Sequence, residues 1–174
     1  YYKYGTIQNL HTRISNHLFA HAAVWYQVNK SNLPALLGCE PNNAESQTDS
    51  SLRALLSFNL VYPKTTVTYK TSYIDDYELY TEKISPTYST YMTYSEIINR
   101  SNMHILRLRQ KISNAVSLST ELQGKIAIAD VGDYGTTKRE NTIAGIASIH
   151  YNKTKLAGNF SVRKEYNSQY KIPL

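Results

Sequence analysis

Cysteine is almost absent from this chain of 174 residues, and Cys39 is the only one. A single thiol excludes an internal disulfide and a zinc site built from several cysteines. The sequence also has no apolar run long enough for the core of a signal peptide or for a membrane-spanning helix. Five prolines and seven glycines are too few for a collagen-like or low-complexity chain.

The residue patterns of common catalytic and metal sites are also missing. The five histidines are dispersed, and none has the HExxH or His-x-His spacing of a metal site. The glycines at 132 and 135 lack the spacing and the following helix of a phosphate-binding loop. No serine lies in a nucleophile elbow. We therefore expect a protein that is not an enzyme, with no catalytic residue, no metal site and no cofactor.

The net charge of +6 raises the question of a nucleic-acid partner. The densest basic cluster, Arg107, Arg109 and Lys111, alternates with apolar residues, which is typical of the polar face of one strand. The other basic residues are scattered along the chain. We therefore expect a solvated face and no nucleic-acid partner.

The sequence is rich in tyrosine, with sixteen, and in segments that alternate apolar and polar residues. From Val116 to Ile128 the even positions are mainly apolar and the odd positions mainly polar, which is the pattern of a strand with two unlike faces. Seven further segments are strand candidates, and helical spacing is not sustained anywhere. The eight predicted strands are Thr6–Arg13, Leu18–Asn29, Ser51–Tyr62, Thr65–Leu79, Tyr94–Ile112, Val116–Ile128, Asn141–Tyr151 and Lys155–Arg163.

The predicted connections alternate between short turns and long loops. The short turns lie at Ser15–His17, Pro63–Lys64, Ser113–Asn114 and Asn152–Thr154, and the long loops at Lys30–Asp49, Tyr80–Thr93 and Val131–Lys138, with a fourth beginning at Asn167. In the segment Tyr94–Ile112 the apolar residues change from odd to even positions. A β-bulge or an overlong strand would explain this change.

Short turns at one end and long loops at the other are typical of a transmembrane, antiparallel, up-and-down β-barrel. The polar face carries a charge density that suits a wet or plug-filled lumen, and the expected lumen-facing residues are Arg53, Lys70, Glu121, Lys125 and Arg163. Interfacial aromatic girdles are expected from Tyr69, Tyr73 and Tyr77 on one face and from Trp25, Tyr26, Tyr62 and Tyr151 near strand ends. Leu118, Leu122 and Ile126 are candidates for the lipid face.

Two alternatives remain open at this point. A soluble, lipocalin-like β-barrel that binds a small apolar ligand has a similar strand pattern, but its apolar face lies inside. A complete small membrane barrel of eight strands is the other alternative. Sequence alone does not say which face of a strand is the inner one.

Two segments resemble TonB-dependent outer-membrane receptors, in particular the branch of the cobalamin receptor. In the first, Gln47-Thr48-Asp49 and Arg53 match a strand entry of the family, and Tyr73, Asp76 and Tyr80 match a strand exit. In the second, "SVRKEYNSQYKIPL", the matching residues are Arg163, Glu165, Ile172, Pro173 and Leu174. The sequence shows no TonB box, no plug domain and no terminal aromatic residue, so residues 1–174 are expected to be an interior segment of a larger barrel.

The resemblance implies TonB-coupled uptake of a scarce nutrient that is cobalamin-, siderophore- or saccharide-like. The implied partners are outer-membrane lipid, the nutrient, a surface lipoprotein, and a TonB-type energy-coupling protein that would act through a plug domain absent from this sequence; the implied location is the bacterial outer membrane. Aromatic and polar side chains suit a large polar ligand. The candidate ligand-binding residues are Trp25, Asn42, Asn43, Asp76, Tyr77, Glu78, Tyr80, Tyr88 and Tyr134. For the aromatic residues among them, interfacial anchoring is the alternative role.

Overall fold

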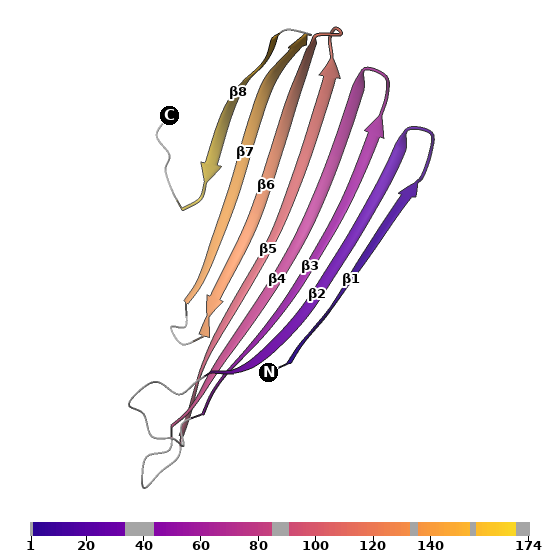
Figure 1. Ribbon diagram of the computed structural model, residues 1–174. Helices are drawn as coiled ribbons and strands as arrows, with labels where there is room; N and C mark the ends of the chain where they lie inside the picture. Colours follow the sequence, from indigo (N-terminus) through magenta and orange to yellow (C-terminus); the bar gives the residue numbers. More distant parts are fainter. Residues whose placement is uncertain (1, 34–43, 85–90, 133–135, 154–155, 170–174) are drawn as a thin grey trace.

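The computed structural model describes residues 2–33, 44–84, 91–132, 136–153 and 156–169. They form one antiparallel sheet whose eight strands follow the order of the sequence, with β1 and β8 at its two edges (Figure 1). The strands are β1 (Tyr2–Arg13), β2 (Leu18–Leu33), β3 (Ala44–Val61), β4 (Thr65–Ile84), β5 (Tyr91–Lys111), β6 (Val116–Val131), β7 (Thr136–Lys153) and β8 (Leu156–Asn167). The expected all-β, up-and-down fold with about eight strands is confirmed.

The strands are longer than the sequence pattern predicts, and the predicted loops are correspondingly too long. Residues 30–33 and 44–49 were expected in a loop but continue β2 and β3, with Asn29 opposite Asp49 and Asn32 opposite Ser46. Likewise 80–84 and 91–93 extend β4 and β5, and 136–138 begin β7. These ends lack the regular apolar–polar alternation that marks a strand, but each of their residues pairs with at least one neighbouring strand. The short turns at 14–17, 62–64 and 112–115 are confirmed.

The bulge expected as one explanation for β5 does not occur. Residues 91–110 pair one to one with β4 and residues 97–111 pair one to one with β6, so neither ladder contains an extra residue. The change of apolar positions arises because both faces of β5 carry apolar residues: Ile97 and Ile105 lie on one face and Leu106 and Leu108 on the other. The second explanation, an overlong strand, is therefore the correct one.

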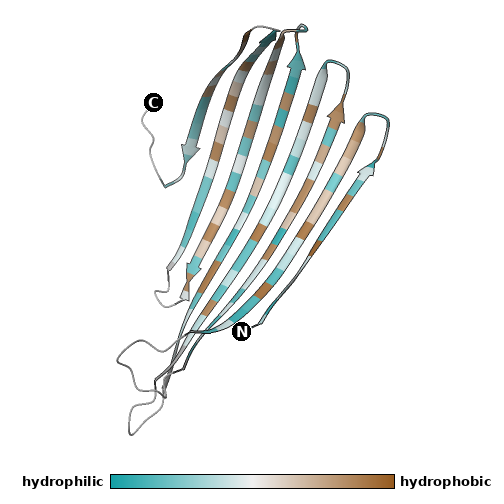
Figure 2. Cartoon of the chain, viewed as in Figure 1, coloured by the Kyte–Doolittle hydropathy of each residue, from teal (hydrophilic) through white to brown (hydrophobic). Residues whose placement is uncertain are grey.

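The register gives the sheet one apolar face and one polar face. Directly opposed residues share a face. Val24, Ala54, Tyr73 and Ile126 belong to one row that crosses the sheet, as the register shows. We call this side the apolar face and the opposite side, which includes Arg53 and Ile74, the polar face. Figure 2 shows the resulting alternation of hydrophobic and hydrophilic residues along the strands.

An apolar band lies on the apolar face next to the short turns, interrupted on β4 and β5 by the polar residues Thr71, Asn102 and His104. It includes residues 18–28 of β2, 52–60 of β3, 116–128 of β6 and 143–151 of β7. These segments have roughly nine to thirteen residues, close to the ~9–11 that a tilted strand needs to cross a bilayer core. Toward the long loops the same face becomes largely polar, with Lys30, Thr48, Ser50, Asp75, Arg100, Asp130 and Arg139.

The sheet is a single layer without a conventional hydrophobic core. Among the described residues, Val28 and Ala144 are the only buried hydrophobic ones, whereas Leu122, Ile143 and Phe160 are 60%, 64% and 67% exposed. The accessible surface of 12785 Å² compares with about 8,600 Å² for a compact monomer of this mass. Many large apolar side chains of the described residues are therefore exposed and are not packed in a core.

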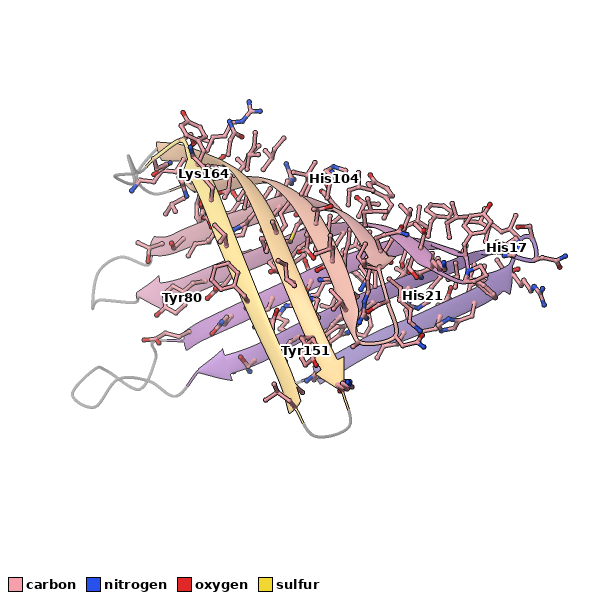
Figure 3. The ribbon with its side chains drawn as sticks, turned by 90° about the horizontal axis from the view of Figure 1, so that it is seen from above. His17, His21, Tyr80, His104, Tyr151 and Lys164 are labelled. Carbon is pink, nitrogen blue, oxygen red and sulfur yellow. The ribbon has the colours of Figure 1, made fainter. Side chains whose placement is uncertain are left out.

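The sheet is also twisted and curved. Seen from above, β7 and β8 run at a large angle to β1 and β2, while His17 and Tyr80 lie at opposite ends of the strands (Figure 3). Several hollows are lined mainly by side chains of the polar face. The polar face is thus the hollowed side of the sheet. In the described part of the chain, no helix is long and apolar enough to cross a membrane.

Candidate functional site

The polar face holds the five residues expected to face a lumen. Successive rows of the register place Arg53 and Lys70 on the same side as Glu121 and Lys125, and Arg163 follows across β7. Side chains alternate strictly between the two faces of a sheet along each strand. Once odd or even positions are assigned correctly to the polar face in each strand, these residues are predicted to share that face. That this side encloses a lumen stays a prediction.

A polar cluster on β2, β3 and β4 forms the centre of the candidate site. Asp76 accepts a hydrogen bond from Ser51 Oγ at 2.5 Å, and the Arg53 guanidinium lies 3.9 Å from the same carboxylate oxygen. The cluster continues through Gln47, whose amide donates to Asp49 at 2.9 Å and to Glu78 at 3.0 Å. These contacts hold three carboxylates on neighbouring strands in fixed positions.

An apolar hollow of about 350 Å³ adjoins this cluster. The polar-face side chains that line it are Ile7, Ala23, Trp25, Arg53, Leu55, Ser72 and Ile74. The Arg53 guanidinium lies 5.0 Å from the centre of the Trp25 ring, within cation–π distance. The site therefore combines an apolar, aromatic surface with hydrogen-bonding groups beside it, a combination found in pockets for organic ligands.

The predicted ligand-binding residues divide into three groups in the structure. Trp25, Asp76 and Glu78 belong to the cluster or its hollow, and Tyr80 lies on the same face opposite Gln47. Tyr77 lies on the apolar face, where burial raises the pKa of its hydroxyl and the Glu96 carboxylate raises it further. Asn42, Asn43, Tyr88 and Tyr134 lie outside the described residues.

Expectations about three aromatic residues need correction. Trp25 and Tyr26 do not lie near a strand end, because both lie within β2. Trp25 is on the polar face between Ile7 and Arg53, and Tyr26 is on the apolar face opposite Leu52. Tyr77 cannot share a site with Asp76 and Glu78 on this sheet, since adjacent strand residues point to opposite faces. Its position, together with Tyr73 on the same face, fits the interfacial role instead.

Sequence reasoning missed several members of the site. It did not select Asn29, whose amide donates to Asp49 at 3.3 Å, or Ser51. The apolar residues Ile7, Leu55 and Ile74 were also missed, because isolated apolar residues on a mainly polar face carry no signal until the strands are paired. For Ser51 a signal existed: the short turn at 62–64 fixes the register of the hairpin and places Ser51 opposite Asp76.

A second ionic group lies deeper along the polar face. Glu121, which is 8% exposed, accepts hydrogen bonds from Arg107 and Gln123. Arg163 forms its own pair with Glu165 on the same strand, at 2.5 Å. A buried carboxylate is stable only with such partners. We therefore assign this group a role in stabilising the sheet.

The chemistry available to the polar face is binding by stacking, hydrogen bonding and charge. Within the described ranges, no group of three or more His, Cys, Asp or Glu side chains is arranged to hold a metal ion. The fold and site define a class of protein. It is a single antiparallel β-sheet with an exposed apolar face on one side and, on the other, a hollowed face that carries hydrogen-bonding side chains.

Comparisons with known proteins give little beyond this class. No family model and no curated protein matches the sequence. Among solved structures, the toluene transporter TbuX of Ralstonia pickettii is similar, with 8% sequence identity and a TM-score of 0.37 over 95% of this chain and 68% of that one. At this level the similarity supports no inference about function.

Proposed function

We propose that this chain forms part of the wall of an outer-membrane β-barrel that takes up a nutrient. The observation that carries the proposal is the exposed apolar band on the apolar face, opposite a polar face. The hydrocarbon core of a bilayer can cover such a band. Paired strands are favoured there because lipid offers no hydrogen-bond partners, so the backbone N–H and C=O groups must bond to one another. The length of the band and the short turns at one end support the same interpretation.

The position of the hollows favours this proposal over a lipocalin-like soluble barrel. A lipocalin-like barrel encloses an apolar interior and presents polar residues to water. Here the hollows lie on the polar face, and the exposed leucine and isoleucine side chains of the described strands lie on the other face, except Ile7 on edge strand β1. Burying this face in a soluble protein would require the sheet to curve the opposite way.

The candidate site points to a ligand with both apolar and hydrogen-bonding parts. Trp25 and its hollow would contact the apolar part, while Arg53, Asp76 and Glu78 would bind polar groups. A cobalamin-, siderophore- or saccharide-like nutrient meets this description. Coupling to a TonB-type protein through a plug domain is the finer part of the proposal, and it is supported by the sequence resemblance alone.

Site-directed labelling tests which face meets lipid. In a Cys39→Ser background, a spin label at Leu122→Cys should be reached by oxygen and protected from a water-soluble nickel chelate when the protein is reconstituted in bilayers. A label at the adjacent Gln123→Cys, on the polar face, should show the reverse. Equal access of the chelate to both labels would overturn the membrane assignment.

Uptake measurements test the transport role separately. In cells limited for candidate nutrients, Trp25→Ala and Asp76→Asn variants should reduce uptake, whereas Asp130→Asn, a carboxylate on the other face, should not. Uptake that persists after deletion of the TonB-type protein would contradict coupling but not transport. If no candidate nutrient is taken up even by the unmodified protein, the transport proposal fails.

A further inference from the structure

A second hollow, of about 370 Å³, lies at the turn end of the polar face. It is bounded by the turn at 62–64, the turn at 112–115 and the end of β7. Its cationic side chains are Lys64, Arg109 and Lys111. Thr66, Ser113, Asn114, Ser117, His150 and Asn152 add hydroxyl, amide and imidazole groups to the lining, and Tyr62, Pro63, Ala115 and Val116 complete it. No Asp or Glu lines the hollow, in contrast to the candidate site nearer the loops.

The three cations have no carboxylate partner among the described residues. Arg107, the next residue on the same face toward the long loops, is paired with Glu121, whereas Arg109 donates a hydrogen bond to the neutral Ser117 Oγ at 3.4 Å. The ion pairs among the described residues are formed by Arg53, Arg100, Arg107 and Arg163 instead. Three like charges around one hollow repel one another, and an anion would relieve this repulsion.

The surrounding backbone holds these groups in place. The Lys111 amide donates to the Lys64 carbonyl at 2.7 Å, and the Asn152 amide donates to the Ala115 carbonyl at 2.7 Å. Ser113 Oγ accepts bonds from the backbone amides of Ala115 and Val116, so its own O–H remains available as a donor. The hollow therefore presents a positioned hydroxyl donor, Ser113, beside cations whose backbone is held by hydrogen bonds.

We propose that this hollow binds a phosphate group. Arginine and lysine are the usual protein ligands of phosphate, and hydroxyl and amide donors suit its remaining oxygens. The small volume favours a single phosphate over an extended acidic segment. A free phosphate or phosphorylated solute and the headgroup of an anionic phospholipid share this chemistry.

Phosphorus NMR on the full protein in a zwitterionic detergent tests the site with inorganic phosphate as the probe. Saturable binding is expected, and Arg109→Gln and Lys111→Gln should each weaken it about tenfold, since a charge-assisted hydrogen bond contributes that much. The matched control is Lys70→Gln, which removes the same charge from the same face outside the hollow. All three side chains are exposed, so folding should be retained.

A further experiment distinguishes a lipid headgroup from a free solute as the source of the phosphate. Nanodiscs with an anionic phospholipid should block binding of inorganic phosphate if the headgroup occupies the hollow, and should leave it unchanged if the ligand is a free solute. Both results support the site. The proposal is overturned if the unmodified protein shows no saturable binding, if Lys70→Gln weakens binding as much as Lys111→Gln, or if an acidic peptide binds the hollow and phosphate does not.

Discussion

The half of the sheet next to the short turns and the half next to the long loops share one backbone ladder but differ in their side chains. Near the turns, one face is apolar and the other polar. Near the loops, both faces are largely polar, as the pair Asp75–Arg100 illustrates on the apolar face and the pair Asp49–Glu78 on the polar face. Backbone pairing between strands therefore determines how long each strand is. The apolar side chains determine how much of that length a bilayer could cover.

The two halves also differ in charge on the polar face. Near the loops, Asp49, Asp76 and Glu78 form the candidate ligand site. Near the turns, the hollow of Lys64, Arg109 and Lys111 has no acidic lining residue. A solute that crosses along this face would meet an acidic region and then a basic one.

The largest expected effect comes from placing a charge in the middle of the apolar band. Leu122→Arg should lower the free energy of unfolding by about 2–4 kcal/mol, the cost of arginine at the bilayer midplane. Urea titration in lipid vesicles measures it. Gln123→Arg, one residue away on the polar face, keeps a donor beside Glu121 and should change stability little. Equal loss at both positions would contradict the assignment of faces.

Removing the buried carboxylate of the polar face should have the next largest effect. Glu121→Ala leaves Arg107 and Gln123 without their acceptor and should cost about 1–3 kcal/mol of unfolding free energy. The control is Glu165→Ala at the sheet edge, whose pair with half-exposed Arg163 should contribute no more than about 1 kcal/mol. If Glu165→Ala lowered the unfolding free energy more than Glu121→Ala, burial of the carboxylate would not explain which ion pair contributes more to stability.

The contact between Trp25 and Arg53 should make a smaller contribution. A double-mutant cycle with Trp25→Leu and Arg53→Gln should give a coupling energy of about 0.5–1 kcal/mol, as expected for a solvent-exposed cation–π pair. Urea titration of the four proteins provides it. A coupling near zero would mean that the two side chains contribute separately to the hollow.

The smallest effect is expected where the apolar face extends beyond the band. Thr48→Arg lies on the same face as Leu56 but near the loops, and should cost less than about 1 kcal/mol in vesicles. Leu56→Arg is the matched variant within the band and should cost clearly more. Similar costs at both positions would remove the boundary between the two halves.

Much of this architecture could be predicted from the sequence because side chains on a strand alternate with a period of two. Alternation at 116–128 and 51–62 identified strands and their faces, and the turns at 14–17, 62–64 and 112–115 were located from polar, proline and asparagine residues. The polar strand ends at 30–33 and 44–49 could not be predicted, because their stability comes from cross-strand backbone pairing, which leaves no side-chain pattern.

The sequence by itself determined the all-β class, the eight strands and the side of each strand on which Arg53, Lys70, Glu121, Lys125 and Arg163 lie. Only the tertiary structure decided that the polar face is the hollowed one, that Trp25 lies against Arg53, and that three cations gather between two turns. The physical reason is that parity along one strand is local, whereas curvature and register depend on pairing between residues far apart in the chain.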